Sequence, residues 1–351
     1  MGSAEETLVL LSPGFPANEA DTTCLPAHQV FVRALHKNFP ALRIIVIAFQ
    51  YPYVSATYTW NGVSIISLNG AMKGKIHRLL LWRRAWQTLK KINRQHNIKG
   101  LLSFWVNECA LIGRYFGKKH HLKHYAWITG QDAKKGNQYV KLLHPKANEI
   151  FAMSDFLATR FFKNYHIKPF KVIPNGIDTQ LFSNKATERS IDILAAGSLI
   201  PLKQYDIFIE VLGLVQKQIA GIVAMLCGKG PEEQKLKTLI AADNLTKNLQ
   251  LAGEKQHLEV LALMQQCKIF LHTSNWEGFS TVCLEALYAG AHVISFFSPM
   301  EKEIPHWHIV KTKEEMAATA LELLLNPSTQ FTPVLPYAMD DIAKQVMELY
   351  E

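Results

Sequence analysis

The sequence lacks the features of a membrane-spanning or disulfide-bonded protein. Its 351 residues contain no run of about 18 consecutive apolar residues, so no transmembrane helix is expected. Glu5 and Glu6 stand where a secretory signal peptide would be basic, which predicts a cytoplasmic protein. The five cysteines form no close pair and no metal-ligand spacing. We therefore expect reduced thiols and no metal site.

Acidic residues are scarce in the first half of the chain. Residues 1–174 carry 24 Lys and Arg against 8 Asp and Glu, whereas residues 175–351 carry 14 against 21. Between Lys73 and Lys123 there are 13 basic residues and one acidic residue, Glu108. This imbalance indicates a basic surface rather than a particular fold.

The most basic segment, residues 73–96, has the pattern of an amphipathic helix. One face would carry Lys73, His77, Arg83, Arg84, Lys90, Lys91 and Arg94, with Ile76 and Leu80 among them; the other would carry Leu81, Trp82, Ala85, Trp86, Leu89 and Ile92. The basic face is either an ordinary solvated surface or one that rests on an anionic membrane or acceptor through Arg83, Arg84, Lys90 and Lys91. Nucleic acid is not an expected partner, because no zinc-finger, RNP or basic-zipper pattern accompanies the charge.

Length and periodicity together predict two α/β domains. A chain of 351 residues with 48% hydrophobic and 19% charged residues is long and apolar enough for two cores. Short apolar runs alternate with helical patterns in each half, which predicts two tandem Rossmann-like, doubly wound parallel sheets facing a cleft. We expect domains at residues 1–172 and 173–335, with a turn at Asn175-Gly176 near their boundary and a last helix, residues 336–351, that packs back toward the first domain.

The segment WEGFSTVCLEALYAG, residues 276–290, carries two glutamates in an otherwise apolar context. We expect a helix that Ser280 caps and Gly290 ends. The start of such a helix favours a phosphate, and Gly278 would let a ligand approach the backbone. The two glutamates do not form a glycosidase pair. Eight helical residues span about 12 Å, whereas the two carboxyls of glycosidases lie at most about 9.5 Å apart. Glu277 and Glu285 therefore suggest an elongated ligand held at two places.

Four motifs in this order resemble the retaining nucleotide-sugar glycosyltransferases of family 4, which have the GT-B fold. They are VIPNGID at residues 172–178, GSLIPLKQYDIFIEVL at 197–212, LCGKGPEEQKL at 226–236, and SNWEGFSTVCLEALYAGAHVIS, the E-x7-E motif, at 274–295. The resemblance is strong over residues 172–296 and loose over the N-terminal half.

The resemblance implies a role for each residue that matches a motif. Glu277 would hold hydroxyls of the donor sugar, and Glu285 would hold the ribose. Lys203 would neutralise charge on the leaving group. Backbone N–H groups of Phe279, Ser280 and Thr281 would hold the diphosphate, and Gly228, Gly230 and Gly253 would shape the loops near the nucleotide. No metal and no cofactor beyond the donor substrate is implied.

The sequence departs from the family pattern at three places. Ser198 stands where the family usually has an arginine. In WITGQDA, residues 127–133, the usual His-Gly pair followed by Asp reads Thr129, Gly130 and Asp132, so the histidine contact to the donor sugar is either missing or supplied by Thr129 or Asp132. Gly14 stands where two glycines are common. We place Thr129, Asp132 and Gly14 on the acceptor and sugar side of the site.

The expected function is therefore the transfer of a sugar from a nucleotide-diphosphate donor to a glycan or lipid-linked acceptor at the inner membrane face, in cell-surface polysaccharide or glycolipid synthesis. Two alternatives share the architecture: a homologue that binds nucleotide sugar without transferring it, and another nucleotide-sugar enzyme such as an epimerase or phosphorylase. Glu277 and Lys203 could also be solvated surface residues and Glu285 an exposed helix residue. His257 and His272 are expected to be structural.

Overall fold

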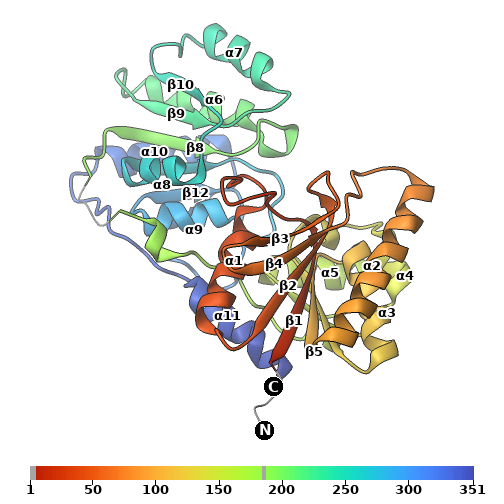
Figure 1. Ribbon diagram of the computed structural model, residues 1–351. Coiled ribbons are helices and arrows are strands. Elements are labelled where there is room, and N and C mark those ends of the chain that lie inside the picture. The colour runs from red at the N-terminus through yellow and green to blue at the C-terminus, as the bar shows by residue number, and fades with distance from the viewer. Residues whose placement is uncertain (1–4, 184–186) are drawn as a thin grey trace. The chain divides into compact units, whose positions relative to one another are not determined.

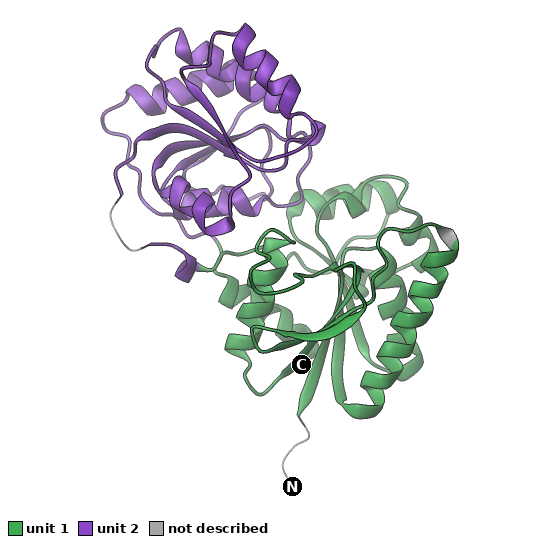
Figure 2. Ribbon diagram, turned by 45° about the horizontal axis from the view of Figure 1, so that its top comes forward, with its two compact units in different colours: residues 1–178, 337–351 green, residues 179–336 purple. Residues whose placement is uncertain are grey.

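The computed structural model describes residues 5–183 and 187–351 and divides the chain into two compact units (Figures 1 and 2). Unit 1 comprises Met1–Asp178 and Tyr337–Glu351, and unit 2 comprises Thr179–Pro336. Each unit is an α/β domain built on one sheet.

The sheet of unit 1 has seven strands in the order β3-β4-β2-β1-β5-β6-β7. Their bounds are β1 Glu6–Gly14, β2 Arg43–Tyr51, β3 Ala56–Trp60, β4 Val63–Ser67, β5 Asn97–Phe104, β6 Lys123–Ile128 and β7 Ile150–Ala152. All pairs are parallel except β3 with β4. The central strands β1 and β2 are buried along most of their length, as a sheet covered on both faces requires.

The β3–β4 pair is an antiparallel hairpin that the sequence analysis does not include. Its two-residue turn is Asn61-Gly62, where φ is 44° and 80°. Positive φ at both central positions is typical of a type I′ turn, for which Asn-Gly is the preferred pair. An Asn-Gly dipeptide between two segments in which apolar and polar residues alternate is the sequence signal that predicts this hairpin.

Helices cover both faces of this sheet (Figure 1). The helices of unit 1 are α1 Pro26–Asn38, α2 Lys75–Gln95, α3 Glu108–His120, α4 Gln138–Leu143, α5 Asp155–Tyr165 and α11 Met339–Met347. On α2 the predicted apolar face packs into the core through Leu81, Ala85, Leu89 and Ile92. No helix within the described ranges combines the length and the apolar character needed to cross a bilayer.

The sheet of unit 2 has six parallel strands in the order β10-β9-β8-β11-β12-β13. They are β8 Ile191–Ala196, β9 Ala224–Cys227, β10 Leu249–Gly253, β11 Cys267–His272, β12 His292–Ser295 and β13 Trp307–Ile309. The helices are α6 Tyr205–Gln216, α7 Glu233–Ala242, α8 His257–Gln265, α9 Thr281–Tyr288 and α10 Lys313–Leu325. Helices α6, α7 and α10 share one core cluster with the sheet, and α8 packs on α9.

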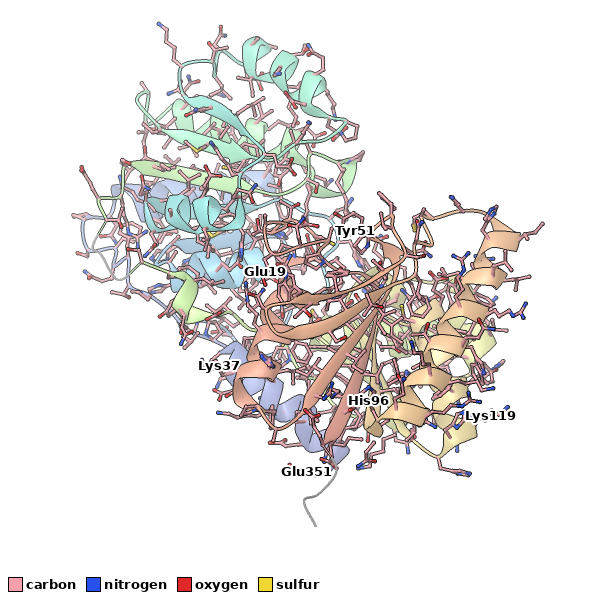
Figure 3. All side chains as sticks on the ribbon, in the orientation of Figure 1. Glu19, Lys37, Tyr51, His96, Lys119 and Glu351 are labelled. Carbon is pink, nitrogen blue, oxygen red and sulfur yellow. The ribbon has the colours of Figure 1, made fainter. Side chains whose placement is uncertain are left out.

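The last 15 residues belong to unit 1, although unit 2 lies between them and the rest of that unit in the sequence. Helix α11 buries Met339, Ile342 and Val346 and packs against α1. Lys37 of α1, labelled in Figure 3, forms an ion pair with Asp340 of α11, with 2.7 Å between Nζ and Oδ2. Beyond the helix, the buried Tyr350 hydroxyl donates to the carbonyl oxygen of Leu101 at 2.8 Å.

The ring of Tyr350 lies where a side chain at Gly100 would be. A Cβ at Gly100 would approach Tyr350 Cε1 to 2.2 Å. Gly100→Ala should therefore displace the ring and reduce the free energy of unfolding by about 1 to 3 kcal/mol, measured by urea denaturation. Gly213→Ala is the control, because a Cβ there has no neighbour within 4 Å. Equal stability of Gly100→Ala and the natural protein would contradict this packing.

Candidate functional site

The candidate site lies in unit 2 at the carboxyl ends of the parallel strands. β8 stands at the centre of the sheet order, with β9 on one side and β11 on the other. The next two strands of the chain, β9 and β10, lie on one side of β8, and the last three lie on the other side, beginning with β11. The strand order therefore reverses between β8 and β11, and doubly wound sheets bind ligands at such a topological switch point. The predicted donor-binding motifs follow these two strands.

The loops after β8 and β9 approach each other backbone to backbone. Gly228 has φ of 155°, and a Cβ there would lie 1.9 Å from the carbonyl oxygen of Gly197. A Cβ at Gly230 would lie 2.4 Å from the carbonyl oxygen of Leu199. Only glycine fits at these two positions. Gly253, at the end of β10, has φ of 69° and open space around it, and Ser198 is exposed.

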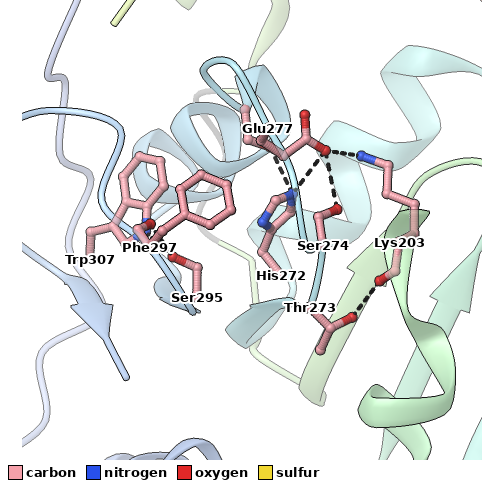
Figure 4. A network of polar contacts seen from close by, with 9 residues as sticks. Lys203, His272, Thr273, Ser274, Glu277, Ser295, Phe297 and Trp307 are labelled. Carbon is pink, nitrogen blue, oxygen red and sulfur yellow. Dashed lines mark hydrogen bonds and ion pairs between the residues drawn. The ribbon is translucent and has the colours of Figure 1, made fainter. Parts of the chain in front are cut away.

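Glu277 is held by three side chains that converge on its Oε1 atom (Figure 4). Lys203 donates to Oε1 and forms an ion pair with it, Ser274 Oγ donates at 3.2 Å, and His272 Nε2 lies 3.4 Å away. Among the residues that the structure describes, none hydrogen-bonds Oε2. Oε2 of Glu277 is therefore the carboxylate oxygen available to a ligand.

Two further hydrogen bonds fix Lys203 beside Glu277. Thr273 Oγ1 donates to the carbonyl oxygen of Lys203 at 2.8 Å, and the N–H of Asn275 donates to the carbonyl oxygen of Leu202 at 3.1 Å. The segment after β11 is therefore joined to the short 3-10 turn Pro201–Lys203 after β8. These hydrogen bonds hold the ammonium group of Lys203 next to the carboxylate of Glu277.

The surroundings of Glu277 keep it ionised. Burial raises the pKa of its carboxyl, but the hydrogen bond from His272 and the charge of Lys203 outweigh burial and bring the pKa to about 2. Burial lowers the pKa of His272 more than Glu277 raises it. At neutral pH the cluster therefore contains a carboxylate and a neutral imidazole.

Helix α9 begins just after Glu277 and extends from Thr281 to Tyr288, with Gly290 at φ of 86° beyond its end. Ser280 is its N-cap residue by position, but the predicted side-chain cap is wrong. Its hydroxyl makes no bond to a helix amide and instead lies 3.2 Å from His272 Nε2. The helix N-terminus, with its partial positive charge, therefore adjoins the Glu277 cluster.

Glu285, on the next turn of α9, is buried and has its own histidine partner. His257 Nε2 lies 2.7 Å from Glu285 Oε1, and the side chains are 15% and 9% exposed. His257 is the first residue of α8, which packs on α9. Each of the two predicted ligand glutamates thus contacts a histidine.

Sequence reasoning treated His257 and His272 as structural and missed their contacts with the motif glutamates. Each contacts a glutamate of the E-x7-E motif. His257 lies 28 residues before Glu285, which hides that contact. His272 is close to Glu277 in the chain and stands at the carboxyl end of β11, where ligand-binding residues gather. That position is the signal that could have indicated it.

The residues predicted for the acceptor and sugar side belong to unit 1. Asp132 is buried, and its two carboxylate oxygens accept from the N–H groups of Val106 at 2.9 Å and Gly130 at 2.8 Å. Burial raises the pKa of Asp132 to about 6, although its hydrogen bonds with backbone N–H groups lower it. Asp132 thus holds its own loop in place. Gly14 ends β1, and the buried Thr129 Oγ1 has no hydrogen-bond partner among the described residues.

The predicted basic residues Arg83, Arg84, Lys90 and Lys91 are all exposed on α2 of unit 1. The acidic residue of this region, Glu108, is buried and accepts hydrogen bonds from Gln50 and from Trp82 Nε1, the latter at 3.0 Å. Its charge is therefore turned away from solvent. Over residues 5–183 and 187–351, no cluster of three or more His, Cys, Asp or Glu side chains has the arrangement of a metal site.

Removal of Lys203 should destabilise unit 2 more than removal of an exposed lysine. In Lys203→Ala the largely buried Glu277 carboxylate loses its cation, which should cost about 2 to 4 kcal/mol in unfolding free energy. Lys203→Met with Glu277→Gln should recover most of that loss. Lys313→Ala breaks an exposed ion pair with Glu210 and should cost at most about 1 kcal/mol. Equal losses in Lys203→Ala and Lys313→Ala, measured by chemical denaturation, would contradict this account.

Residues 176–333 match the family described as "Glycosyl transferases group 1". Two curated relatives match over similar lengths. The chain is 26% identical over 203 residues to the phosphatidylinositol N-acetylglucosaminyltransferase gpi3 subunit of Schizosaccharomyces pombe, covering 56% of this chain and 44% of that protein. It is 27% identical over 202 residues to a Campylobacter jejuni diphospho-undecaprenol 4-alpha-N-acetylgalactosaminyltransferase, covering 54% of each. The chain thus spans about half the length of these relatives.

Solved structures resemble the whole chain. Sucrose-phosphate synthase from Thermosynechococcus elongatus has a TM-score of 0.73 at 13% identity, with 98% of each chain covered. Anabaena HepE, in complex with UDP and glucose, has a TM-score of 0.70 at 15% identity, with 99% of each covered. These likenesses show the fold. The chain thus has the GT-B fold, and its residues 176–333 are similar to the group 1 glycosyltransferases.

Proposed function

We propose that this protein is a retaining glycosyltransferase that moves a sugar from a nucleotide-diphosphate donor to a glycan or lipid-linked acceptor, in cell-surface polysaccharide or glycolipid synthesis. The observation that carries the proposal is the Lys203–Glu277 pair at the switch point of a group 1 domain. The names of the relatives support a lipid-linked acceptor, since one acts on phosphatidylinositol and the other on a diphospho-undecaprenol. The HepE complex supports a UDP-sugar donor.

The site residues suit the ionic character of such a donor. The N-terminus of α9 and the N–H groups of Phe279, Ser280 and Thr281 would receive the diphosphate, whose negative charge they favour. Glu277 Oε2 would accept from a hydroxyl of the donor sugar. Glu285 would accept from the ribose. Lys203 contributes a fixed positive charge next to the position of the leaving phosphate.

The proposed reaction needs no metal and no separate base. The bond between the anomeric carbon and the diphosphate breaks, and the acceptor oxygen bonds to that carbon on the same face of the sugar. The leaving phosphate takes the proton of the acceptor hydroxyl. Lys203 and the α9 N-terminus stabilise the charge that develops on this phosphate, which is how preorganised groups lower such a barrier.

Binding of the donor is testable by thermal shift with UDP, GDP, ADP and their sugar conjugates. A ligand at 100 times its dissociation constant stabilises the folded state by about 2.7 kcal/mol. We expect one base series to raise the melting temperature of the natural protein and to have little effect on Glu285→Ala. No shift with any of these compounds would contradict the proposal. Free nucleotide released only when an acceptor is added would separate transfer from binding alone and from an epimerase.

We also propose that unit 1 rests on the anionic inner face of a membrane through α2. Its exposed basic residues, Arg83, Arg84, Lys90 and Lys91, suit a negatively charged surface. Large apolar side chains are exposed at the start of the same helix and just before it: Ile76 is 75% exposed, Leu79 61% and Met72 79%. Apolar residues beside a basic face are typical of helices that lie in a membrane interface.

Charge reversal should weaken this attachment. Each Lys or Arg near an anionic surface contributes about 1 kcal/mol, so Arg83→Glu/Arg84→Glu should reduce partition onto phosphatidylglycerol vesicles by at least about 30-fold, measured by sedimentation. The charge-matched control is Lys217→Glu/Lys247→Glu, at two exposed positions of unit 2. If both variants sediment like the natural protein, α2 is an ordinary solvated helix.

A further inference from the structure

His257 and Glu285 form a contact between two helices at the predicted nucleotide end of the site. The carboxylate oxygen can only accept, so His257 Nε2 carries the hydrogen in the 2.7 Å contact with Glu285 Oε1. The side chain of Glu285 is 9% exposed and that of His257 is 15% exposed. Water therefore competes little for this bond.

The position of His257 is set by the start of α8. Gln256 precedes the helix, and its N–H donates to Glu259 Oε2 at 2.8 Å in a capping box. Helix α8 packs on α9, which carries Glu285. A side chain on a capped helix end that packs on its partner helix has little freedom, so His257 offers its N–H in a fixed direction.

Only one oxygen of Glu285 is used by the protein. Oε1 accepts from His257, and no residue in the described part of the chain hydrogen-bonds Oε2. Oε2 is not a buried atom without a partner, so it is accessible to solvent at the surface of the site. It is therefore the oxygen of Glu285 that a ligand hydroxyl can reach.

We propose that His257 is a positioning residue for nucleoside binding. By holding Oε1, it turns Oε2 of Glu285 toward the bound nucleoside diphosphate and leaves one acceptor for one ribose hydroxyl. Without His257 the carboxylate can rotate and offer either oxygen, or both, to the vicinal diol. The proposal rests on the nucleotide-sugar function proposed above and adds His257 as the residue that makes Glu285 discriminate between the two hydroxyls.

The test is isothermal titration calorimetry with UDP, 2′-deoxy-UDP and 3′-deoxy-UDP, or the corresponding set for the base that the thermal-shift panel selects. A hydrogen bond to a charged group corresponds to roughly 10- to 100-fold in affinity. The natural protein should therefore bind one deoxy analogue roughly 10- to 100-fold more weakly than UDP and the other about as well as UDP.

Three substitutions of His257 separate its hydrogen bond from its bulk. His257→Gln places an amide N–H near the position of Nε2 and should keep both affinity and discrimination. His257→Asn is polar but too short to reach Glu285, and with His257→Ala it should lose about 10-fold in UDP affinity and most of the difference between the analogues. The Gln and Asn pair carries the test if the alanine variant does not fold. Glu259→Ala is the control, because it removes the capping box but leaves His257 in place.

Each outcome supports the proposal or overturns it. If His257→Asn and His257→Ala bind all three nucleotides as the natural protein does, His257 has no positioning role, while the proposed function stands. A Glu259→Ala variant that loses discrimination as His257→Ala does would assign the effect to the placement of α8 and overturn the role of the imidazole. A folded natural protein that binds no nucleoside diphosphate would overturn the proposed function and this inference together.

Discussion

The ionised carboxylate of Glu277, largely buried at the carboxyl edge of the unit 2 sheet, is the constraint on which the candidate site depends. Burial raises the pKa of this carboxyl, and His272 and Lys203 lower it and keep the carboxyl ionised. Their presence requires that the segments after β8 and β11 meet, which Thr273 and the neighbouring backbone bonds achieve. The charge that the proposed chemistry would use thus depends on contacts that also join these two segments.

Both glutamates of the E-x7-E motif follow the same arrangement. Oε1 of Glu277 accepts from Lys203 and Ser274, Oε1 of Glu285 accepts from His257, and Oε2 of each makes no bond to the described residues. Side chains that are fixed through one oxygen can present the other without reorganisation when a ligand arrives. Preorganisation of this kind is the main means by which polar sites gain binding and catalytic strength.

The sequence predicts the architecture well because parallel sheets leave a simple pattern of short apolar runs alternating with helices. It does not reveal the β3–β4 hairpin unless the Asn61-Gly62 turn is weighed. For the site, the motif residues after β11 and in α9 are found by pattern, whereas the contact of His257 with Glu285, 28 residues away, arises only when α8 packs on α9. Ser280 illustrates the limit: its position as N-cap is predictable, but a buried histidine takes its hydroxyl.

The most direct test of the central claim is a crystal structure of the protein with its nucleoside diphosphate bound. The account predicts the diphosphate at the N-terminus of α9 within reach of Lys203, and a ribose hydroxyl on Glu285 Oε2 with His257 still on Oε1. A nucleotide bound away from the β8–β11 switch point, or a diphosphate remote from α9 with the Glu277 cluster unoccupied, would contradict it.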